Sequence, residues 1–433
     1  MLLLLLACDG PKVTPGDETG PIGHDSPLDS LPTITDSDST DDSPAESHSA
    51  HSGESGESGD SGDPPEPPPV PDVVVDCNGG ADFTTITEAI QASVSGTKIG
   101  LNPCTYNEDV NFIGKSLEVF GIDGSATTII DGLGAGPVIT AIRGESIGTR
   151  LAGVTVTGGG GNYGAGIWMN GTVMELEDVI FTGNGRTYAV LYGEGISITL
   201  IDTVFTANRM QSGGYVTYID NGNMLGERLT VDCDGADIGI YEHNATLLLD
   251  STVSCEDASY AVYVDSAEVA VRRSTIKGGS YGLYGADSAD TRNERMWVYN
   301  SVVTGGNTAA YASYLHFKAD NSVFYGGNNG LRLADCHIDS YVYNSALIGD
   351  ECALKTDRYP YAIGWNAIGG GEMCNAEGFS TVTGDPKFVD APNDFHLKPS
   401  SPLVDAGDPD ADHEDVDGSR NDVGGYGGPS GSW

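Results

Sequence analysis

One short pattern recurs nine times along this chain. Two of its copies are EDVIFTGN at 177–184 and IDTVFTAN at 201–208, in which apolar and polar residues alternate before Gly, Asn or Asp. Successive copies are 24, 25, 24, 23, 26, 21, 23 and 22 residues apart. No copy could bury its apolar face alone, so the copies must stack. Their central apolar residues are Ile180, Val204, Leu229, Val253, Ile276, Val302, Val323, Ala346 and Ile368.

A repeat of this length predicts one coil of a parallel β-helix, with two or three short strands in each coil. A leucine-rich repeat is the competing architecture, but its Leu/Asn consensus is absent from the copies. Upstream of the repeats, Thr85-x-x-Glu88 forms a capping box. A short helix over the following residues is expected to cover the open end of the solenoid, since an open sheet edge invites aggregation.

The stretch DFTTITEAIQASVSGTKIGLNPCTYNEDVNFIGKSLEVFGIDGSATTIIDG resembles the N-terminal cap and first coils of pectin lyase-like right-handed β-helix proteins, which include pectin methylesterases. Tyr106-x-Glu108-x-Val110 is its most recognisable element. The end of the chain, with DPKFVDAPNDFHLKPSSPLVDAGDPD and DVDGSRNDVGGYGG, resembles the closing coil and tail of bacterial surface β-helix proteins. The resemblance implies an all-β, right-handed parallel β-helix within residues 73–433 and specifies no activity.

Composition divides the chain further. Residues 9–72 hold 16 acidic residues, one basic residue and 12 of the 21 prolines, without any Phe, Tyr, Trp or Cys. Such a segment cannot bury enough apolar surface to offset its ordering entropy, so a disordered tether is expected. The predicted organisation is a signal remnant at 1–7, a tether at 8–72, the cap and first coil at 73–116, the β-helix at 117–395, and a closing coil with an acidic Gly-rich tail at 396–433.

The run Leu5-Leu6-Ala7-Cys8 resembles the lipobox of bacterial lipoproteins. That resemblance implies a lipid on Cys8, a flexible stalk behind it, and a place in the bacterial cell envelope, at the outer membrane or cell surface. Membrane contact would then occur through the lipid anchor only. The alternative is an ordinary short signal remnant with an unmodified cysteine. A formal net charge of −43 excludes nucleic acid as a partner.

Seven further cysteines suit an exported, oxidising compartment. Two pairs are spaced by 22 residues, close to one coil, which would bring their members within disulfide reach. Another pair flanks the first structured segment. One cysteine, Cys336, is left without a partner. The candidate disulfide residues are Cys77, Cys104, Cys233, Cys255, Cys352 and Cys374.

An apolar–aromatic pair recurs before six of the nine repeats, and its aromatic member steps by 24, 26, 23, 22 and 21 residues. If the apolar member points inward, period two turns the aromatic one outward, so a stripe along the solenoid is expected. These aromatics are Trp168, Tyr192, Tyr218, Tyr241, Tyr263 and Tyr284. Two positions further on, the same face carries Asn170, Glu194, Asp220, His243 and Asp265.

The stripe, together with Glu194 and His243, is a candidate polysaccharide-binding surface, because aromatic rings stack on pyranoses and carboxylates accept hydroxyl hydrogen bonds. Two alternatives stay open. Stacked rings on successive coils could stabilise the solenoid without any ligand. A carboxylate pair on the stripe could instead hydrolyse glycosidic bonds.

Arg295, His316 and Asp339 occupy equal offsets on three successive copies. Such a row could abstract a proton from a uronate, or it could be a solvated ladder of ion pairs. The motifs of pectin methylesterases, pectate lyases, polygalacturonases and alginate epimerases are not assembled in the chain. The candidate catalytic residues are therefore Asp220, Asp265, Arg295, His316 and Asp339.

In the tail, Asp408-x-Asp410-x-Asp412 predicts a calcium site, with a plain acidic loop as the alternative.

Taken together, these patterns favour a lipid-anchored surface β-helix protein that binds glycans or is structural or adhesive. The alternative is a polysaccharide-active enzyme, a lyase, hydrolase or epimerase. The acidic charge favours neutral glycans over uronates unless a cation such as calcium bridges the two.

Overall fold

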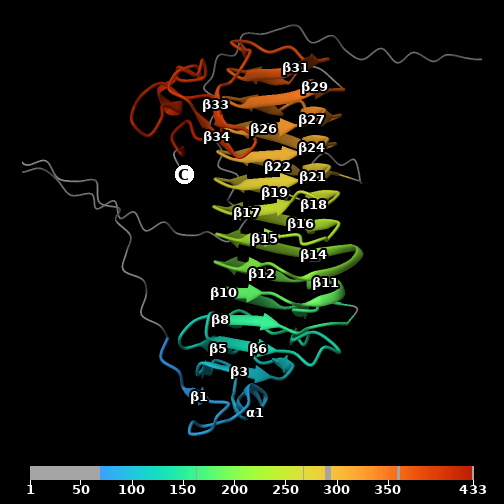
Figure 1. Cartoon of the computed structure of the whole chain (residues 1–433), viewed down its shortest axis with the longest axis vertical. Helices are drawn as coiled ribbons and strands as arrows, with labels where there is room; N and C mark the ends of the chain where they lie inside the picture. Colours follow the sequence, from blue (N-terminus) through green and yellow to red (C-terminus); the bar gives the residue numbers. More distant parts are fainter. Residues whose placement is uncertain (1–68, 162, 267, 288–293, 358–360, 432–433) are drawn as a thin grey trace, which may run out of the picture. The chain divides into compact units, whose positions relative to one another are not determined.

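The computed structural model describes residues 69–161, 163–266, 268–287, 294–357 and 361–431. Cys8 and nearly all of the predicted tether lie outside these residues. The described part is a right-handed parallel β-helix in which 32 strands belong to one continuous sheet that winds around the core (Figure 1). The prediction of an all-β solenoid is confirmed. Among the described residues, no helix is long and apolar enough to span a membrane.

Each coil contributes strands to three faces, which we call A, B and C. The chain passes through them in this order in every coil, as in β2 (Lys98–Leu101), β3 (Cys104–Asn107) and β4 (Val110–Asn111). Face A contains β1 (Val73–Val75), β2 (Lys98–Leu101), β5 (Glu118–Gly121), β12 (Ser197–Ile201), β19 (Glu268–Arg272), β22 (Arg295–Tyr299), β25 (His316–Asp320), β28 (Tyr341–Tyr343) and β30 (Ala362–Gly364). Face B contains β3 (Cys104–Asn107), β6 (Thr128–Asp131), β13 (Val204–Phe205), β15 (Thr230–Asp232), β17 (Thr252–Cys255), β20 (Thr275–Gly278), β23 (Val302–Gly305), β26 (Val323–Gly326) and β32 (Val382–Thr383).

Face C contains β4 (Val110–Asn111), β7 (Ile139–Ala141), β9 (Ile167–Asn170), β11 (Gly185–Glu194), β18 (Tyr260–Asp265), β21 (Tyr281–Ala286), β24 (Thr308–Ser313) and β27 (Asn329–Ala334). Longer strands run from one face into the next. They are β8 (Arg150–Thr157) and β10 (Val173–Phe181) from A to B, β14 (Arg209–Glu227) and β16 (Ile238–Leu249) from C to A, and β29 (Ala346–Thr356) and β31 (Ala367–Cys374) from B to C.

The corner between faces A and B repeats one local structure. Its first residue has a left-handed backbone, with φ of 42–49° from Asp250 to Asn344, which Asn and Asp tolerate best. A buried serine follows, and its Oγ accepts the backbone N–H of the serine one coil earlier at 3.0–3.3 Å. This serine ladder ties successive coils together. It consists of Ser251, Ser274, Ser301, Ser322 and Ser345.

Replacing Ser301 by Ala should destabilise the solenoid, because the N–H of Ser274 would lose its acceptor inside the protein. We expect the free energy of unfolding to fall by about 1–3 kcal/mol, measured by denaturant titration. The matched control is Ser280→Ala, which alters an exposed serine. Equal stability of the two variants would contradict a structural role for the serine ladder.

The predicted register needs a correction in four copies. Val204 pairs with Thr230, which in turn pairs with Thr252, and Ala346 pairs with Ala367. The residues chosen from the sequence in these copies, which are Leu229, Val253, Ile276 and Ile368, therefore lie one position away from the paired column. Adjacent apolar residues in these strands hide the inside–outside alternation, which a one-residue shift inverts.

The candidate cysteines form three disulfides, Cys77–Cys104, Cys233–Cys255 and Cys352–Cys374, with Cα–Cα distances of 6.3, 4.9 and 5.7 Å. Cys336 is a buried free thiol. The prediction that these six cysteines form disulfides is therefore confirmed, whereas the exported compartment stays a prediction.

A seven-residue helix, α1 (Ile86–Ala92), lies at the N-terminal end of the stack (Figure 1). Thr85 Oγ1 accepts the N–H of Glu88 at 3.2 Å, and the Glu108 carboxylate accepts the N–H groups of Ile86 and Thr87 at 2.8 and 2.9 Å. A carboxylate at this position also favours the positive end of the helix dipole. That α1 protects the open end from association stays a prediction.

The C-terminal tail packs against the outer surface of face B. It contains the antiparallel pair β33 (Phe388–Asp390) and β34 (Asp394–Leu397) and the short η1 (Ala411–His413). This second apolar cluster joins tail residues to outward-facing residues of four successive coils. Its buried members are Val302, Val323, Ala346, Ala367, Phe388, Phe395, Leu403 and Val423.

Candidate functional site

The predicted aromatic column lies in register on face C. Tyr192 pairs with Trp168 and Tyr218, and the same column continues through each following coil. From Tyr192 onward the rings stack, with centroids 4.8–5.6 Å apart and planes within 4–15° of parallel. We call this column the ladder. It consists of Trp168, Tyr192, Tyr218, Tyr241, Tyr263, Tyr284 and Tyr311, the last of which the sequence analysis missed.

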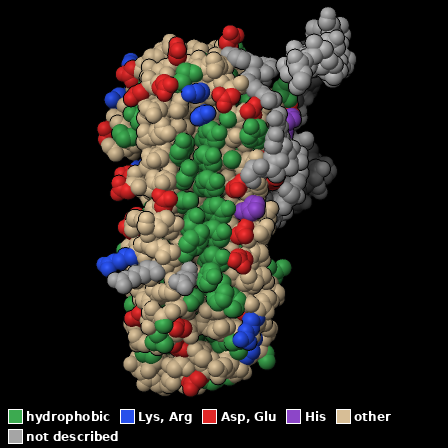
Figure 2. Space-filling view, turned by 90° about the vertical axis from the view of Figure 1, so that its right-hand side faces the viewer, with side chains coloured by type: hydrophobic (Ala, Val, Ile, Leu, Met, Phe, Trp, Pro, Cys, Tyr) green, Lys and Arg blue, Asp and Glu red, His purple; other side chains and the backbone are tan. Residues whose placement is uncertain are grey.

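Buried apolar neighbours hold the ladder outward. The residues before the aromatics, such as Leu191, Ile240 and Val262, are fully buried, as the period-two argument requires. At its C-terminal end the ladder is continued by Arg332, whose guanidinium carbon lies 5.2 Å from the centroid of the Tyr311 ring, a cation–π contact. Figure 2 shows the aromatic surface as a continuous green band along the face, with acidic side chains and a histidine along one edge.

A second column of tyrosines runs beside the ladder, and the sequence analysis did not predict it. In β18 and β21 the pattern is Tyr-x-x-Tyr, with two buried residues between two partly exposed rings. The first buried residue is small, Ala261 or Gly282, and a Cβ on Gly282 would come within 2.4 Å of the Thr304 carbonyl oxygen. The strand can therefore bend there and turn both tyrosines outward. The column contains Tyr163, Tyr188, Tyr215, Tyr260 and Tyr281, and Ile238 occupies the register position between Tyr215 and Tyr260.

The two columns differ in the direction of their rings. Ladder rings stack along the solenoid, so their flat faces lie against one another rather than toward solvent. Three rings of the second column stand nearly perpendicular to them, at 73° for Tyr215 with Tyr218, 76° for Tyr260 with Tyr263 and 84° for Tyr281 with Tyr284. Tyr163 instead lies 19° from parallel to Trp168, and Tyr188 is tilted by 60° from Tyr192. Sugar stacking was predicted for the ladder, but the ring planes that run along the solenoid belong to the second column.

A polar edge borders the ladder, as the sequence predicted. Asn170, Glu194, Asp220 and His243 occupy one register position on successive coils. Tyr192 donates its hydroxyl hydrogen bond to Glu194, and burial together with this carboxylate raises the pKa of the Tyr192 phenol. The Asp220 carboxylate lies 2.9 Å from His243 Nδ1, and the two side chains are 35% and 39% exposed.

Glu242 lies inside the coil between two outward candidates, Tyr241 and His243, and was not predicted. Its side chain is fully buried, and neither carboxylate oxygen has a hydrogen-bond partner among the described residues. Burial, with a smaller contribution from the Asp220 charge, raises the pKa of Glu242 well above the ordinary value. Because it is sealed from solvent, this carboxyl group cannot contact a polysaccharide in this conformation.

The raised pKa makes stability depend on pH. A folded-state pKa above the unfolded value means that the stabilising contribution is complete below the ordinary glutamate pKa of about 4.3 and is lost as pH rises toward the folded value. Thermal melting should therefore show wild type and Glu242→Gln as equals near pH 4 and the variant as more stable at pH 8. The control variant is Glu256→Gln, which alters an exposed glutamate and should melt as wild type does at both pH values. A pH-independent gap between wild type and Glu242→Gln would refute the assignment.

The remaining candidates lie elsewhere on the coil. Arg295 and His316 pair in register at the starts of β22 and β25 on face A, whereas Asp220 and Asp265 lie on the strands of face C. Arg295 contacts Glu268 at 3.5 Å. Asp339 lies close to His316, and His337, which the sequence analysis missed, joins them. The structure thus places the five catalytic candidates in two groups.

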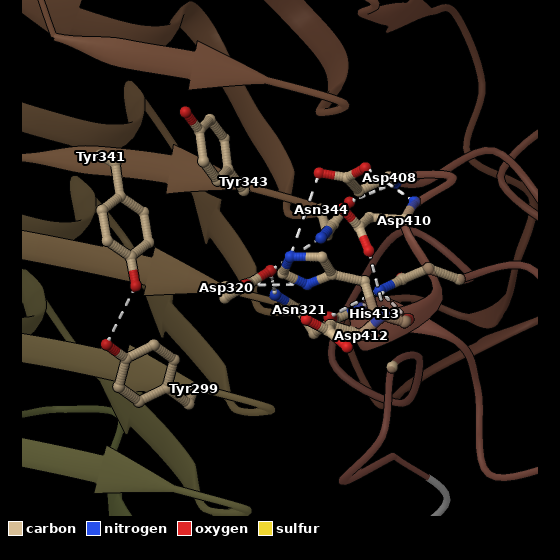
Figure 3. Close-up of polar contacts among 12 residues, drawn as sticks. Tyr299, Asp320, Asn321, Tyr341, Tyr343, Asn344, Asp408, Asp410, Asp412 and His413 are labelled. Atoms are coloured by element: carbon tan, nitrogen blue, oxygen red, sulfur yellow. Dashed lines mark hydrogen bonds and ion pairs between the residues drawn. The ribbon is translucent and has the colours of Figure 1, made fainter. Parts of the chain in front are cut away.

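The predicted calcium residues lie on the tail, against the ends of β25 and β28 (Figure 3). Asp408 and Asp410 accept backbone N–H groups from Asp410 and Asp412 at 3.0 and 3.2 Å. The imidazole of His413 stands between Asp320 and Asp408, with contacts of 3.8 and 4.0 Å. Burial is the main cause that raises the pKa of Asp320. Calcium binding by these three aspartates stays a prediction.

No family model and no curated protein sequence matches the chain. Similar solved structures include the A-module of the mannuronan C-5 epimerase AlgE4 of Azotobacter vinelandii, with 11% identity over 69% of this chain and 91% of that chain and a TM-score of 0.42. A pectate lyase, Pel9A, has 14% identity over 80% and 91% with a TM-score of 0.39, and a pectin methylesterase from carrot has 12% over 73% and 89% with a TM-score of 0.23. At these identities and TM-scores, no activity is transferred to this chain.

Proposed function

We propose that the aromatic surface of face C binds a polysaccharide that lies along the solenoid. The observation that carries the proposal is the second column, in which the ring planes of Tyr215, Tyr260 and Tyr281 run along the solenoid. The polar edge lies on the opposite side of the ladder. Aromatic faces suit the apolar faces of sugar rings, while Glu194 and Asp220 can accept hydroxyl hydrogen bonds. The seven rungs of the ladder span about 29 Å at about 4.8 Å per coil, long enough for several sugar units.

Charge narrows the class of ligand. The chain has 63 acidic residues against 20 basic ones, and carboxylates line the edge of the aromatic surface. A polyuronate would meet like charges there, which disfavours binding. Neutral glycans are therefore the proposed ligands.

Binding is tested by affinity electrophoresis in neutral glucans, mannans and xylans, with alginate and pectate as acidic comparisons. Tyr260→Ala and Tyr281→Ala should each weaken binding of the retained glycan by about 2- to 10-fold, because each removes one stacking face. Phe at the same positions should preserve binding. Tyr241→Phe, which keeps a ladder ring and removes its hydroxyl, is the matched control. Absence of any retained glycan, or equal retardation of wild type and both Ala variants, would refute the proposal.

A second candidate function is catalysis on the bound glycan, and the Asp220–His243 pair favours it. A carboxylate that orients an accessible imidazole is an arrangement suited to proton transfer. Hydrolysis, elimination and epimerisation all need such a step. The pair lies at the edge of the aromatic surface, on the side of the ladder opposite the second column.

Catalysis is tested by incubating the retained glycan with the protein and following reducing ends, unsaturated sugars by ultraviolet absorbance, and epimers by proton NMR. His243→Ala and Asp220→Asn should lower the rate by about 10²- to 10⁴-fold. His396→Ala removes a histidine of the tail that is likewise paired with an aspartate, Asp394, and should have no effect. Retained binding with no product from wild type would leave a purely binding protein.

We further infer that Cys8 carries a lipid and that residues 9–72 tether the solenoid to the bacterial cell envelope. The lipobox-like run and the acidic, Pro-rich composition support this inference. A long flexible tether would let an anchored domain reach a polysaccharide outside the membrane.

A further inference from the structure

Three metal-ligating side chains meet on two successive coils of the solenoid. His316 is the first residue of β25, while His337 and Asp339 belong to the loop before β28 one coil later. Backbone hydrogen bonds fix that loop, from His337 N–H to the Leu315 carbonyl at 2.9 Å and from Ser340 N–H to the His337 carbonyl at 3.0 Å. The Ser340 hydroxyl also accepts the N–H of Phe317 at 3.0 Å. The three side chains are therefore held by an anchored backbone.

The distances suit a shared ion. His337 Nδ1 lies 3.2 Å from Asp339 Oδ2 and also accepts the backbone N–H of Asp339 at 3.2 Å. One ligand atom from each of the three side chains lies within 4.8 Å of the others. Two ligands at about 2.0–2.2 Å from one tetrahedral zinc ion are about 3.4 Å apart. The His337–Asp339 pair already has this separation, and an ion bound through His337 Nδ1 would replace the Asp339 N–H at that atom. His316 lies within the same 4.8 Å group.

The two imidazole rings of the group are stacked, with centroids 3.9 Å apart and planes 26° from parallel. The nearest basic group in register, Arg295, contacts Glu268 and lies 5.5 Å from the centroid of the Trp297 ring. Asp339 is exposed, with 70% of its side chain accessible, and His337 is 34% accessible. An ion could therefore enter from solvent.

We propose that His316, His337 and Asp339 bind a divalent transition-metal ion of the zinc class. Two neutral imidazoles and one carboxylate suit Zn²⁺, Cu²⁺ or Ni²⁺, whereas Ca²⁺ and Mg²⁺ prefer oxygen ligands alone. Three protein ligands and an exposed position leave room for water as the fourth ligand, as in zinc sites that keep an open position. The site lies on face A and does not depend on the proposed function of face C.

The test is isothermal titration of Zn²⁺ into the full chain without a polyhistidine tag. We expect one equivalent to bind, and His316→Ala and His337→Ala each to weaken binding by at least about tenfold. Asp339→Asn should also weaken it. Titration with Co²⁺ supplies a second measurement, since its visible absorption band should appear in wild type and disappear in the histidine variants.

Two matched controls contain a histidine beside an aspartate, namely His396 with Asp394 at 2.7 Å and His243 with Asp220 at 2.9 Å. Neither pair is in the three-ligand group found among the described residues. His396→Ala and His243→Ala should therefore bind Zn²⁺ as wild type does. Melting without metal verifies that each variant is folded. No Zn²⁺ binding by wild type, unchanged affinity in both ligand variants, or the same loss in the controls would overturn the proposal.

Discussion

The repeated corner between faces A and B fixes the register on which every surface of the solenoid depends. A left-handed residue turns the chain from face A to face B, and the serine after it bonds to the neighbouring coil, so each of these coils starts face B in step with the one before. Side chains alternate with period two, and a slip of one residue would turn a column of side chains from outside to inside. The alignment of Tyr241, Tyr263 and Tyr284 on face C accompanies this register on the same coils.

The two aromatic columns have different physical consequences. Rings of the ladder present their flat faces to each other, so their stacking stabilises neighbouring coils whether or not a ligand is present. Tyr260 and Tyr281 contact the ladder through perpendicular rings, and they also lie against each other across two coils, with centroids 5.3 Å apart and planes 15° from parallel. Both columns therefore contribute contacts between coils, and the second differs from the ladder in the direction of its ring planes.

The sequence predicted what repeats and missed what depends on local bends. Repeat length, the parallel β-helix, the disulfide residues and the ladder all follow from spacing, because stacking converts equal intervals into columns. Tyr215, Tyr260 and Tyr281 were not predicted because a strict period of two assigns residues three apart to opposite faces. The pattern Tyr-x-x-Tyr with a small residue inside could have indicated them. His337 was not predicted because it lies in a loop whose length varies between coils. Glu242 was not predicted because period two assigns an apolar residue to its inward position.

Polar groups in the coil are distributed by the same alternation, which separates their chemistry. Glu242 points into a dry interior, where desolvation favours its neutral form, whereas Asp220 and His243 point outward and contact each other in partial solvent. The His316 group lies beyond the turn that ends face C, on a different face from the aromatic surface. A ligand on face C would therefore meet rings, hydroxyls and the Asp220–His243 pair, while a metal ion on face A could bind without displacing it.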